Sequence, residues 1–136
     1  MDDALFDYGR KILAAQPFSV LLGTELVTFE PGRAELALDV KPEHLQQHGF
    51  VHGGVVSYLA DNALTYAGGS VLGDSVTLEF KINYLRPARG RRLVARSRLT
   101  GSGKTQAVCQ CDVVAIDEEG AELLCAAAQG TIWKVG

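Results

Sequence analysis

One short stretch of the sequence concentrates the residues that could act on a substrate. It begins with His52-Gly53-Gly54, and Asp61 follows eight residues after Gly53. Ser57, Asp61 and Thr65 are four residues apart, so a helix would present them as one polar stripe among apolar positions. A carboxylate on such a helix can serve as a general base or as a nucleophile. The alternative is an ordinary hydrogen-bonded or solvent-facing aspartate, which is the commonest fate of an acid on a helix.

The glycine pair stands where this helix would begin. The first backbone N–H groups of a helix have no partner within it and lie at the positive end of the helix dipole. Because glycine has no Cβ, a substrate oxygen could approach the N–H groups of Gly53 and Gly54 closely, as in an oxyanion hole. A tight turn in which glycine only supplies a positive φ is the other interpretation.

The spacing of these groups limits how they can cooperate. Eight residues of helix place Gly53 and Asp61 on one face, about 12 Å apart along the axis. They are therefore too far apart to act on one carbonyl group. If both serve the same substrate atom, one of them must come from a second, antiparallel copy of the helix. This predicts a two-fold dimer with composite sites.

The elements before this stretch indicate a helix and a hairpin. Asp2 and Asp3 can cap a first helix with apolar residues at helical spacing, and this helix ends before Pro17. The segment 19–29 is rich in Val, Leu and Thr, which is typical of a strand. The sequence Glu30-Pro31-Gly32-Arg33 predicts a type II turn, and the alternation in 34–40 predicts the second strand of the hairpin.

The elements after it indicate one buried helix and an antiparallel meander. Residues 55–67 have a wide apolar face, and we expect Gly68-Gly69 to end this helix. Apolar and polar residues alternate over 76–84, with Thr77 on the polar face. Strands follow over 93–100 and 107–115, and we interpret the ambiguous segment 121–133 as a last strand. The expected fold class is α+β, with helices on one face of an antiparallel sheet.

The composition fits one compact domain spanning residues 1–136. Hydrophobic residues make up 47% and charged residues 21% of the chain, as in globular proteins that bury a core. The chain starts with acidic residues and no apolar run is long enough to cross a membrane, so we expect a cytoplasmic protein without a membrane partner. The odd count of 3 cysteines agrees with a reducing compartment. A net charge of -3 argues against nucleic acid as a partner.

Three motifs together resemble one protein family. The segments His52-Gly53-Gly54, Leu59-Ala60-Asp61 and Asn83-Tyr84-Leu85-Arg86-Pro87 are similar in order and spacing to the hotdog-fold acyl-CoA thioesterases of the phenylacetate-pathway (PaaI-like) type. The resemblance extends over nearly the whole chain. It implies a long central helix wrapped by a curved antiparallel β-sheet, with a short N-terminal helix. It also implies a dimer that pairs both helices and sheets.

The resemblance implies a role for each matching residue. Asp61 would be the catalytic carboxylate, attacking the thioester directly or activating a water molecule. The Gly53 N–H would bind the thioester oxygen, and His52 would shape that turn. Thr77 falls where the family has a hydroxyl near the attacking water, although it could also be an ordinary strand threonine. Gln46 stands where many members have an asparagine that orients the thioester, and its stem is one methylene longer.

A cluster of basic residues adds a candidate for substrate binding. Six of the eight arginines lie between Arg86 and Arg98, where they could form a solvated strand edge, a nucleic-acid patch or a site for the phosphates of coenzyme A. Few aromatic residues interleave the cluster, which disfavours nucleic acid. With the resemblance in view, we expect Gly54, Arg86, Arg89 and Lys104 to bind the substrate. Coenzyme A would be part of that substrate.

The expected function is therefore the hydrolysis of aryl- or medium-chain acyl-CoA by a homodimer or homotetramer. A thioester is already activated and its thiolate leaves readily, so we expect neither a metal nor a separate cofactor. The alternatives on the same fold are a non-catalytic acyl-CoA-binding module, which the change at Gln46 favours, and a hydratase or dehydratase. The latter typically needs a different arrangement of histidine and acid.

Other chemistry remains open at three places. His44, His48 and His52 are four residues apart and would suit zinc if they shared a helix, although glycines interrupt that segment. Cys109 and Cys111 point to one face of a strand, which fits small core residues better than a metal or redox pair. The chain has no G-x-S-x-G motif, so Ser57 is a poor candidate for a serine nucleophile.

Overall fold

The computed structural model describes residues 3–136, so the expected capping residue Asp2 lies outside the described residues. The chain starts with α1 (Asp3–Ala14), which ends before Pro17 as predicted. The strand expected from Ser19 is wrong over its first part, because residues 17–22 form α2 (Pro17–Leu22) and β1 begins at Glu25. Proline at the first helical position has its φ already set for a helix, and Gly23 ends α2 in the left-handed region at φ 77°.

Six antiparallel strands form one sheet. They are β1 (Glu25–Glu30), β2 (Arg33–Asp39), β3 (Ser75–Tyr84), β4 (Arg92–Ser102), β5 (Gln106–Ile116) and β6 (Glu122–Lys134), in the order β1-β2-β4-β5-β6-β3. The predicted hairpin turn is confirmed by Gly32, whose φ of 80° suits the third position of a type II turn. The ambiguous C-terminal segment is the strand β6, paired on both sides.

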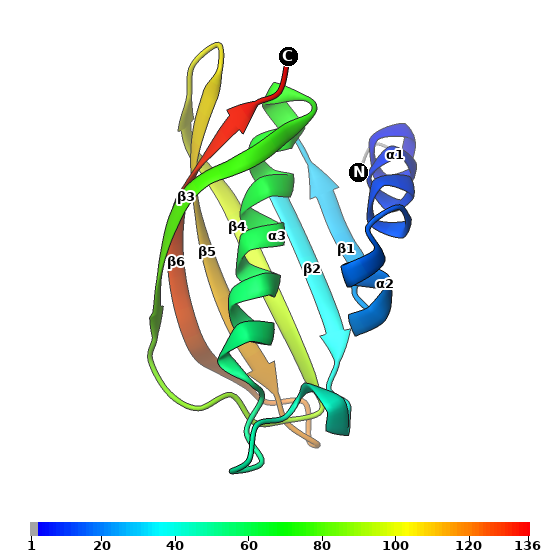
Figure 1. Ribbon diagram of the computed structural model, residues 1–136, viewed down its shortest axis with the longest axis vertical. Coiled ribbons are helices and arrows are strands. Elements are labelled where there is room, and N and C mark those ends of the chain that lie inside the picture. The colour runs from blue at the N-terminus through cyan, green and yellow to red at the C-terminus, as the bar shows by residue number, and fades with distance from the viewer. Residues whose placement is uncertain (1–2) are drawn as a thin grey trace.

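The concave side of this sheet wraps around α3 (Gly53–Leu72), as Figure 1 shows. The small helices α1 and α2 lie beside the β1 edge on the same side. The buried side chains of α3 and the inward side chains of the strands form the main core. This is the hotdog fold that the resemblance implies. Within the described residues, no helix is both long and apolar enough to cross a membrane.

The helix α3 does not end at Gly68-Gly69, which corrects the expected stop. It continues to Leu72, and Gly73 at φ 83° follows its last turn. A Cβ on Gly68 would lie only 2.7 Å from Cβ of Ile132 on β6, so glycine is needed here for close contact between helix and sheet. Glycine in the sequence can indicate either the end of a helix or a close contact between a helix and a sheet, because both favour a residue without a side chain.

The strand β3 differs from the expected simple alternation. A bulge lies between Thr77 and Glu79, and it shifts which side chains face the helix. Val76 and Leu78, expected on the buried face, are 53% and 61% exposed in the protomer. Thr77, expected on the outer polar face, is half-buried and contacts α3. β3 is also an edge strand of the sheet.

Candidate active site

Asp61 lies at the middle of α3 within a cluster of hydroxyl groups. Thr77 Oγ1 on β3 donates to Asp61 Oδ1 across 2.5 Å. Thr65 Oγ1, one helical turn further along, donates to the Asp61 carbonyl oxygen at 2.9 Å and lies 2.7 Å from Thr77 Oγ1. All three residues are half-buried. The carboxylate is therefore oriented through Oδ1, while Oδ2 has no hydrogen-bond partner among the described residues.

The first turn of α3 leaves one backbone donor unused. His52 is the N-cap, and its Nδ1 accepts the Gly54 N–H at 2.8 Å. The His52 carbonyl oxygen accepts the N–H groups of Val55 at 2.9 Å and Val56 at 3.3 Å. Within residues 3–136, no acceptor takes the Gly53 N–H. The geometry thus separates the two glycines: Gly53 offers the free donor expected of an oxyanion hole, and the Gly54 N–H is already bound.

Tyr84, at the end of β3, fixes the same turn from the other side. Its hydroxyl donates to the Gly53 carbonyl oxygen at 3.0 Å. That carbonyl and the Gly54 N–H belong to one peptide unit, so Tyr84 and His52 hold this unit at both of its polar atoms. A Cβ on Gly54 would lie 3.0 Å from His52 Nδ1, which explains why the capping imidazole needs glycine there.

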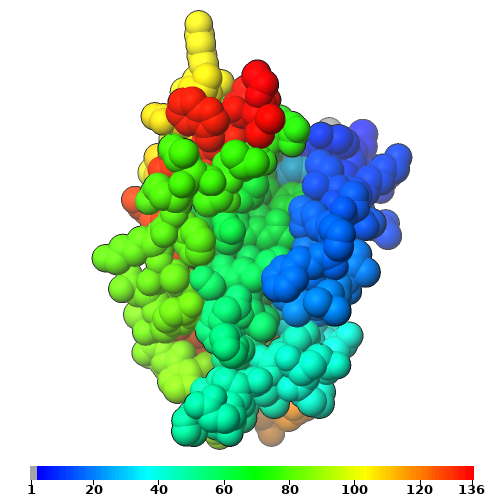
Figure 2. Space-filling view, in the orientation of Figure 1, coloured from blue at the N-terminus to red at the C-terminus, as the bar shows by residue number. Residues whose placement is uncertain are grey.

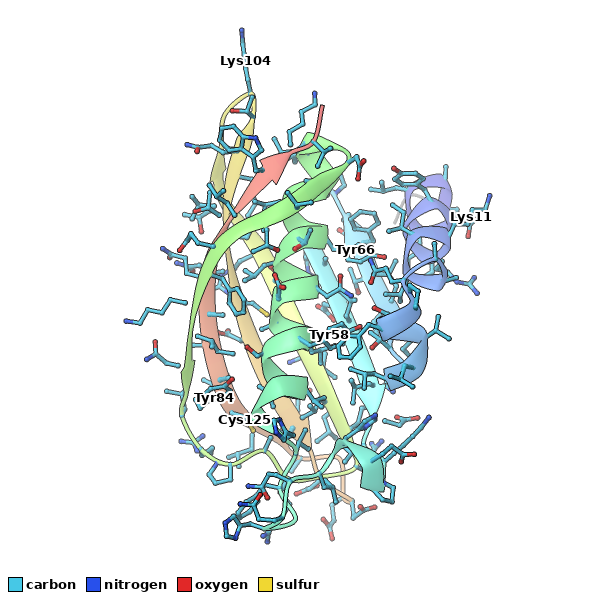
Figure 3. The ribbon with its side chains drawn as sticks, in the orientation of Figure 1. Lys11, Tyr58, Tyr66, Tyr84, Lys104 and Cys125 are labelled. Atoms are coloured by element: carbon cyan, nitrogen blue, oxygen red, sulfur yellow. The ribbon has the colours of Figure 1, made fainter. Side chains whose placement is uncertain are left out.

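A groove of about 430 Å³ opens beside the free Gly53 N–H. Its lining comes from the loop before α3, the first turn of α3, the end of β3 and the start of β6; Gln46, Phe50, Val51, Gly53, Val56, Tyr84, Leu85, Arg86, Pro87, Ala88 and Cys125 form it. In Figure 3, Tyr84 and Cys125 mark this end of the molecule. The volume is that of a binding site for a small molecule or an extended part of one.

Gln46 lines this groove, but its side-chain carbonyl oxygen binds backbone N–H groups of the loop. Oε1 accepts the His48 N–H at 2.6 Å and the Phe50 N–H at 3.3 Å, which closes the loop before α3. Gly49 at φ 85° completes the turn. The side-chain amide nitrogen has no partner within the described residues, so it is the group of Gln46 that could reach a ligand in the groove.

The basic residues divide into three groups. Arg86 lines the groove and donates to the Leu124 carbonyl oxygen at 2.8 Å, and the Arg89 guanidinium lies 4.6 Å from the ring centroid of Phe50. Lys104 stands at the tip of the β4–β5 hairpin, at the opposite end of the protomer (Figure 3). The structure therefore brings Arg86 and Arg89 together with Gly53 but places Lys104 far from them within one chain.

The remaining arginines on β4 belong to ion pairs on the outer face of the sheet. Arg92 contacts Glu25 at 2.5 Å and Asp39 at 2.8 Å, and Arg96 binds Glu122 at 2.7 Å. These side chains therefore fit the interpretation of the arginine cluster as a solvated strand edge.

The histidines do not form the helix that the zinc alternative requires. His44 ends a 3₁₀ turn (Pro42–His44), His48 lies in the following turn, and His52 caps α3. His44 is buried and instead accepts the Lys41 N–H through Nδ1 at 3.0 Å. Its carbonyl oxygen accepts the His52 N–H at 2.8 Å, so it supports the loop that leads to the cap.

Three residues near the site were not singled out as site residues from the sequence. Thr65 was visible in the polar stripe, and its spacing from Asp61 was the signal. Tyr84 and Cys125 meet the start of α3 only through the fold, since they are 31 and 72 positions away from Gly53 in the chain. Burial raises the pKa of the Cys125 thiol, and the nearby Ala115 backbone and Arg86 act against that shift.

Comparisons with known proteins find one matching family. Residues 48–122 match the model of the thioesterase superfamily, a segment that contains the α3 start, Asp61 and Thr77. A solved thioesterase family protein from Silicibacter pomeroyi has 35% identity and a TM-score of 0.89, covering 93% of this chain and 96% of that one.

Two further relatives carry more specific names. A variant of the phenylacetic acid degradation protein PaaI from Thermus thermophilus has 32% identity and a TM-score of 0.78, covering 88% of this chain and 100% of that one. The medium/long-chain acyl-CoA thioesterase YigI of Escherichia coli is 28% identical over 82% of this chain and 84% of its own length.

Proposed function

Because the chain belongs to the thioesterase superfamily, we propose that it hydrolyses acyl-CoA thioesters with Asp61 as the catalytic carboxylate. The observation that carries the proposal is the carboxylate geometry. Asp61 is held by Thr77 through Oδ1, and its second oxygen is left without a protein partner among the described residues. A carboxylate in this state can accept a proton from a water molecule placed against the thioester.

The proposed reaction uses two groups of this chain. Asp61 removes a proton from water as the water oxygen forms a bond to the thioester carbon. The carbonyl oxygen becomes negative and accepts a hydrogen bond from the Gly53 N–H, which also lies at the positive end of α3. The carbon–sulfur bond then breaks, and the proton passes to the departing sulfur, which yields the free acid and coenzyme A. No metal is needed, because a thiolate is a good leaving group.

The two groups would come from different protomers. Eight residues along α3 separate Gly53 from Asp61 by about 12 Å, which is too far for one thioester carbon. A homodimer with antiparallel helices would place Gly53 of one protomer opposite Asp61 of the other. The exposed apolar side chains of Val76 and Leu78 on the edge strand β3 support self-association, since a monomer would expose them to water. A homotetramer would combine two such dimers.

The substrate and the location complete the proposal. The relatives' names, phenylacetic acid degradation and medium/long-chain acyl-CoA thioesterase, support an aryl or medium-chain acyl group on coenzyme A. Arg86 and Arg89 beside the groove would face the phosphates of coenzyme A. Three cysteines without disulfides agree with the reducing cytoplasm.

The test compares wild-type protein with Asp61→Asn and Asp61→Ala on a panel of aryl- and straight-chain acyl-CoAs, following release of free thiol. We expect turnover to fall by at least about a hundredfold in both variants while circular dichroism and the oligomeric state stay unchanged. Turnover that does not depend on Asp61 would refute the catalytic assignment. Binding of acyl-CoA without any turnover would favour the non-catalytic acyl-CoA-binding module.

A matched pair at Gly53 tests the oxyanion donor. Gly53→Pro removes only the N–H, and proline is favoured at the first position of a helix. His52 has φ -57° and ψ 135°, a conformation that a residue before proline adopts readily. Gly53→Ala keeps the N–H, and its Cβ would be 3.5 Å from Tyr84, an ordinary contact. We expect a loss of about 10²–10³ in kcat for the proline variant and little change for alanine. Equal activities would refute the role of this N–H.

A further inference from the structure

Four neighbouring strands carry one row of polar side chains across the outer face of the sheet, the side away from α3 (Figure 1). Strand pairing sets Arg98 of β4 beside Gln110 of β5, Gln110 beside Gln129 of β6, and Gln129 beside Lys81 of β3. Successive side chains of a strand point to opposite faces, and the two cysteines that flank Gln110 belong to the main core. The row therefore lies on the opposite side of the sheet from the candidate active site.

A pocket of about 310 Å³ opens over this row. Its lining residues come from β3, β4, β5 and β6; they are Lys81, Asn83, Arg98, Gln110, Asp112, Ala127, Ala128 and Gln129. Apart from the two alanines, every lining side chain is polar or charged. The volume is at the lower end of the range for small-molecule sites, so the pocket suits a small polar ligand.

The hydrogen bonds within the row run in one direction. Arg98 Nη2 donates to Gln110 Oε1 at 2.8 Å, and Gln110 Nε2 donates to Gln129 Oε1 at 3.0 Å. A guanidinium has only donors, so it fixes the Gln110 amide with its oxygen toward Arg98 and its nitrogen toward Gln129. The Gln129 oxygen is then occupied in turn. The free end of this chain of hydrogen bonds is the Gln129 amide nitrogen, which can only donate.

The next side chain in the row is also a donor. Lys81 has an ammonium group with three N–H donors and no acceptor. Within residues 3–136, no acceptor binds the Lys81 ammonium or Gln129 Nε2. Side chains directly opposite each other on antiparallel strands have Cβ atoms about 4.5–5.5 Å apart, so these two groups can reach one ligand. Two adjacent donors without an acceptor form an arrangement that an anion completes.

The charges around the pocket also favour an anion. Asp112 is the one carboxylate among the lining residues, and its Oδ2 lies 3.7 Å from Arg98 Nη1. Since these two charges offset each other, Lys81 leaves the pocket with a net positive charge. Glu79, two residues before Lys81 on β3, lies outside the lining, and its Oε2 accepts the Thr131 hydroxyl at 2.7 Å.

We propose that this pocket on the outer face of the sheet binds the phosphate group of a small polar phosphate monoester. A phosphate group presents three strong acceptor oxygens, which can take hydrogen bonds from Lys81 and from the Gln129 amide together. The pocket has room for more than a phosphate group alone, and the Asn83 amide is available to hydroxyl groups of the ligand. Because the sheet separates this pocket from α3, the inference does not depend on the proposed thioesterase function.

The test titrates the ¹⁵N-labelled protein with inorganic phosphate and with glycerol 3-phosphate at constant ionic strength. NMR follows the side-chain NH₂ signals, and those of Gln129 are identified by their loss in Gln129→Glu. We expect the Gln129 signals to shift to saturation, with a Kd on the order of 1 mM for inorganic phosphate. Glycerol 3-phosphate should bind at least about threefold more tightly, because its hydroxyl groups can reach Asn83.

Lys81→Gln and Lys11→Gln form a matched pair, since each removes one positive charge from an exposed lysine. Lys11 lies on α1, beside the β1 edge of the sheet, whereas β3 is the opposite edge (Figure 3). We expect Lys81→Gln to weaken phosphate binding about tenfold or more, and Lys11→Gln to change it less than about twofold. Gln129→Glu should abolish binding, because its carboxylate would itself accept from Lys81. Circular dichroism and the oligomeric state are measured for each variant.

Three results would overturn this inference. The first is the absence of a saturable shift of the Gln129 signals up to about 20 mM phosphate. The second is equal weakening in Lys81→Gln and Lys11→Gln, which would mean that net charge attracts phosphate without a defined site. The third is a changed oligomeric state in Lys81→Gln, which would assign these donors to contacts with a second copy of the chain.

Discussion

The peptide unit between Gly53 and Gly54 shows how single residues prepare the site. Tyr84 donates to its oxygen and His52 accepts from its nitrogen, so the unit cannot rotate freely. These two contacts also limit the orientation of the neighbouring Gly53 N–H, which would bind the thioester oxygen. A donor that is fixed before the reaction stabilises developing charge without reorganisation during it. In the proposed mechanism Tyr84 would thus be a positioning residue, since it would act through the Gly53–Gly54 backbone.

Tyr84→Phe tests this role at the residue scale. The variant keeps the ring beside Gly53 and loses only the hydrogen bond. We expect kcat to fall about three- to tenfold with KM nearly unchanged, which is less than the loss for a missing oxyanion donor. Tyr84→Leu, which also removes the ring from the groove, should raise KM in addition. Steady-state kinetics on one substrate separates these effects, and an unchanged kcat in Tyr84→Phe would contradict the positioning role.

At the scale of elements, the contact between α3 and β6 places Asp61 opposite Thr77. Gly68 allows α3 to lie against Ile132, and Gly130 of β6 in turn has no room for a side chain, because a Cβ there would be 2.6 Å from Phe80 Cβ. The bulge in β3 then turns Thr77 toward the helix. Asp61 on α3 can reach the Thr77 hydroxyl only because α3 packs this closely against the sheet.

Gly68 and Gly69 in α3 provide a matched pair of substitutions that tests this contact between α3 and β6. Gly68→Ala would place its Cβ 2.7 Å from Ile132 Cβ, and we expect a loss of about 1–3 kcal/mol in unfolding free energy from overpacking. Gly69→Ala meets only a flexible serine hydroxyl and gains helix propensity, so its stability should stay equal or rise by up to about 1 kcal/mol. Urea unfolding measures both, and equal stabilities would show that the sheet yields to the added methyl group.

At the scale of the whole molecule, the proposed mechanism would divide the site into two halves within one protomer. The Gly53 groove and the Asp61 cluster are separated along α3, and each lacks the group that the other holds. Figure 2 shows atoms of α3 at the surface between β3 and the N-terminal helices, so this face is open to a second copy. The composite site is thus a property of the proposed dimer.

Mixing two inactive variants tests the composite site. In a mixed dimer of Asp61→Ala and Gly53→Pro, one site would carry both changes and the other would carry neither. Random reassortment makes half of the dimers mixed, so we expect about a quarter of wild-type activity after unfolding and refolding the two variants together. Separately refolded variants mixed without exchange are the control and should stay inactive. Absence of recovery in a verified mixed dimer would place both groups in one chain.

The buried thiols make a prediction about alkaline pH. Burial raises the pKa of Cys109 to about 11 and that of Cys111 to about 12, where burial is again the largest cause. Between about pH 9 and pH 11 the unfolded chain therefore binds fewer protons than the folded one, and stability falls as pH rises. We expect a loss on the order of 1–2 kcal/mol per thiol by pH 10.5, measured by urea unfolding with reductant present. In Cys109→Ala the unfolding free energy should fall less steeply with pH than in the wild-type protein. An identical dependence on pH would contradict the role of the buried Cys109 thiol.

Local periodicity and backbone restriction are enough to predict part of this structure from the amino-acid sequence. Alternation along 107–115 correctly predicted which β5 side chains face the main core, and four-residue spacing correctly placed Ser57, Asp61 and Thr65 on one helix. The Pro31-Gly32 turn and the helix start at Gly53 were visible for the same reason. Each of these follows from the chain's own geometry within a few residues, together with the burial of apolar side chains.

Which distant groups meet depends instead on how the whole chain packs. Thr77 faces Asp61 because a bulge between Thr77 and Glu79 changes the phase of the first part of β3. Tyr84 reaches Gly53 because β3 runs beside the start of α3. Gly68 serves a close contact instead of a helix stop, because Ile132 of β6 lies against it. Residues 17–22 fold as a helix, with Ser19 bound by Tyr58 of α3 at 2.6 Å. Such contacts depend on packing between segments far apart in sequence, which no local pattern specifies.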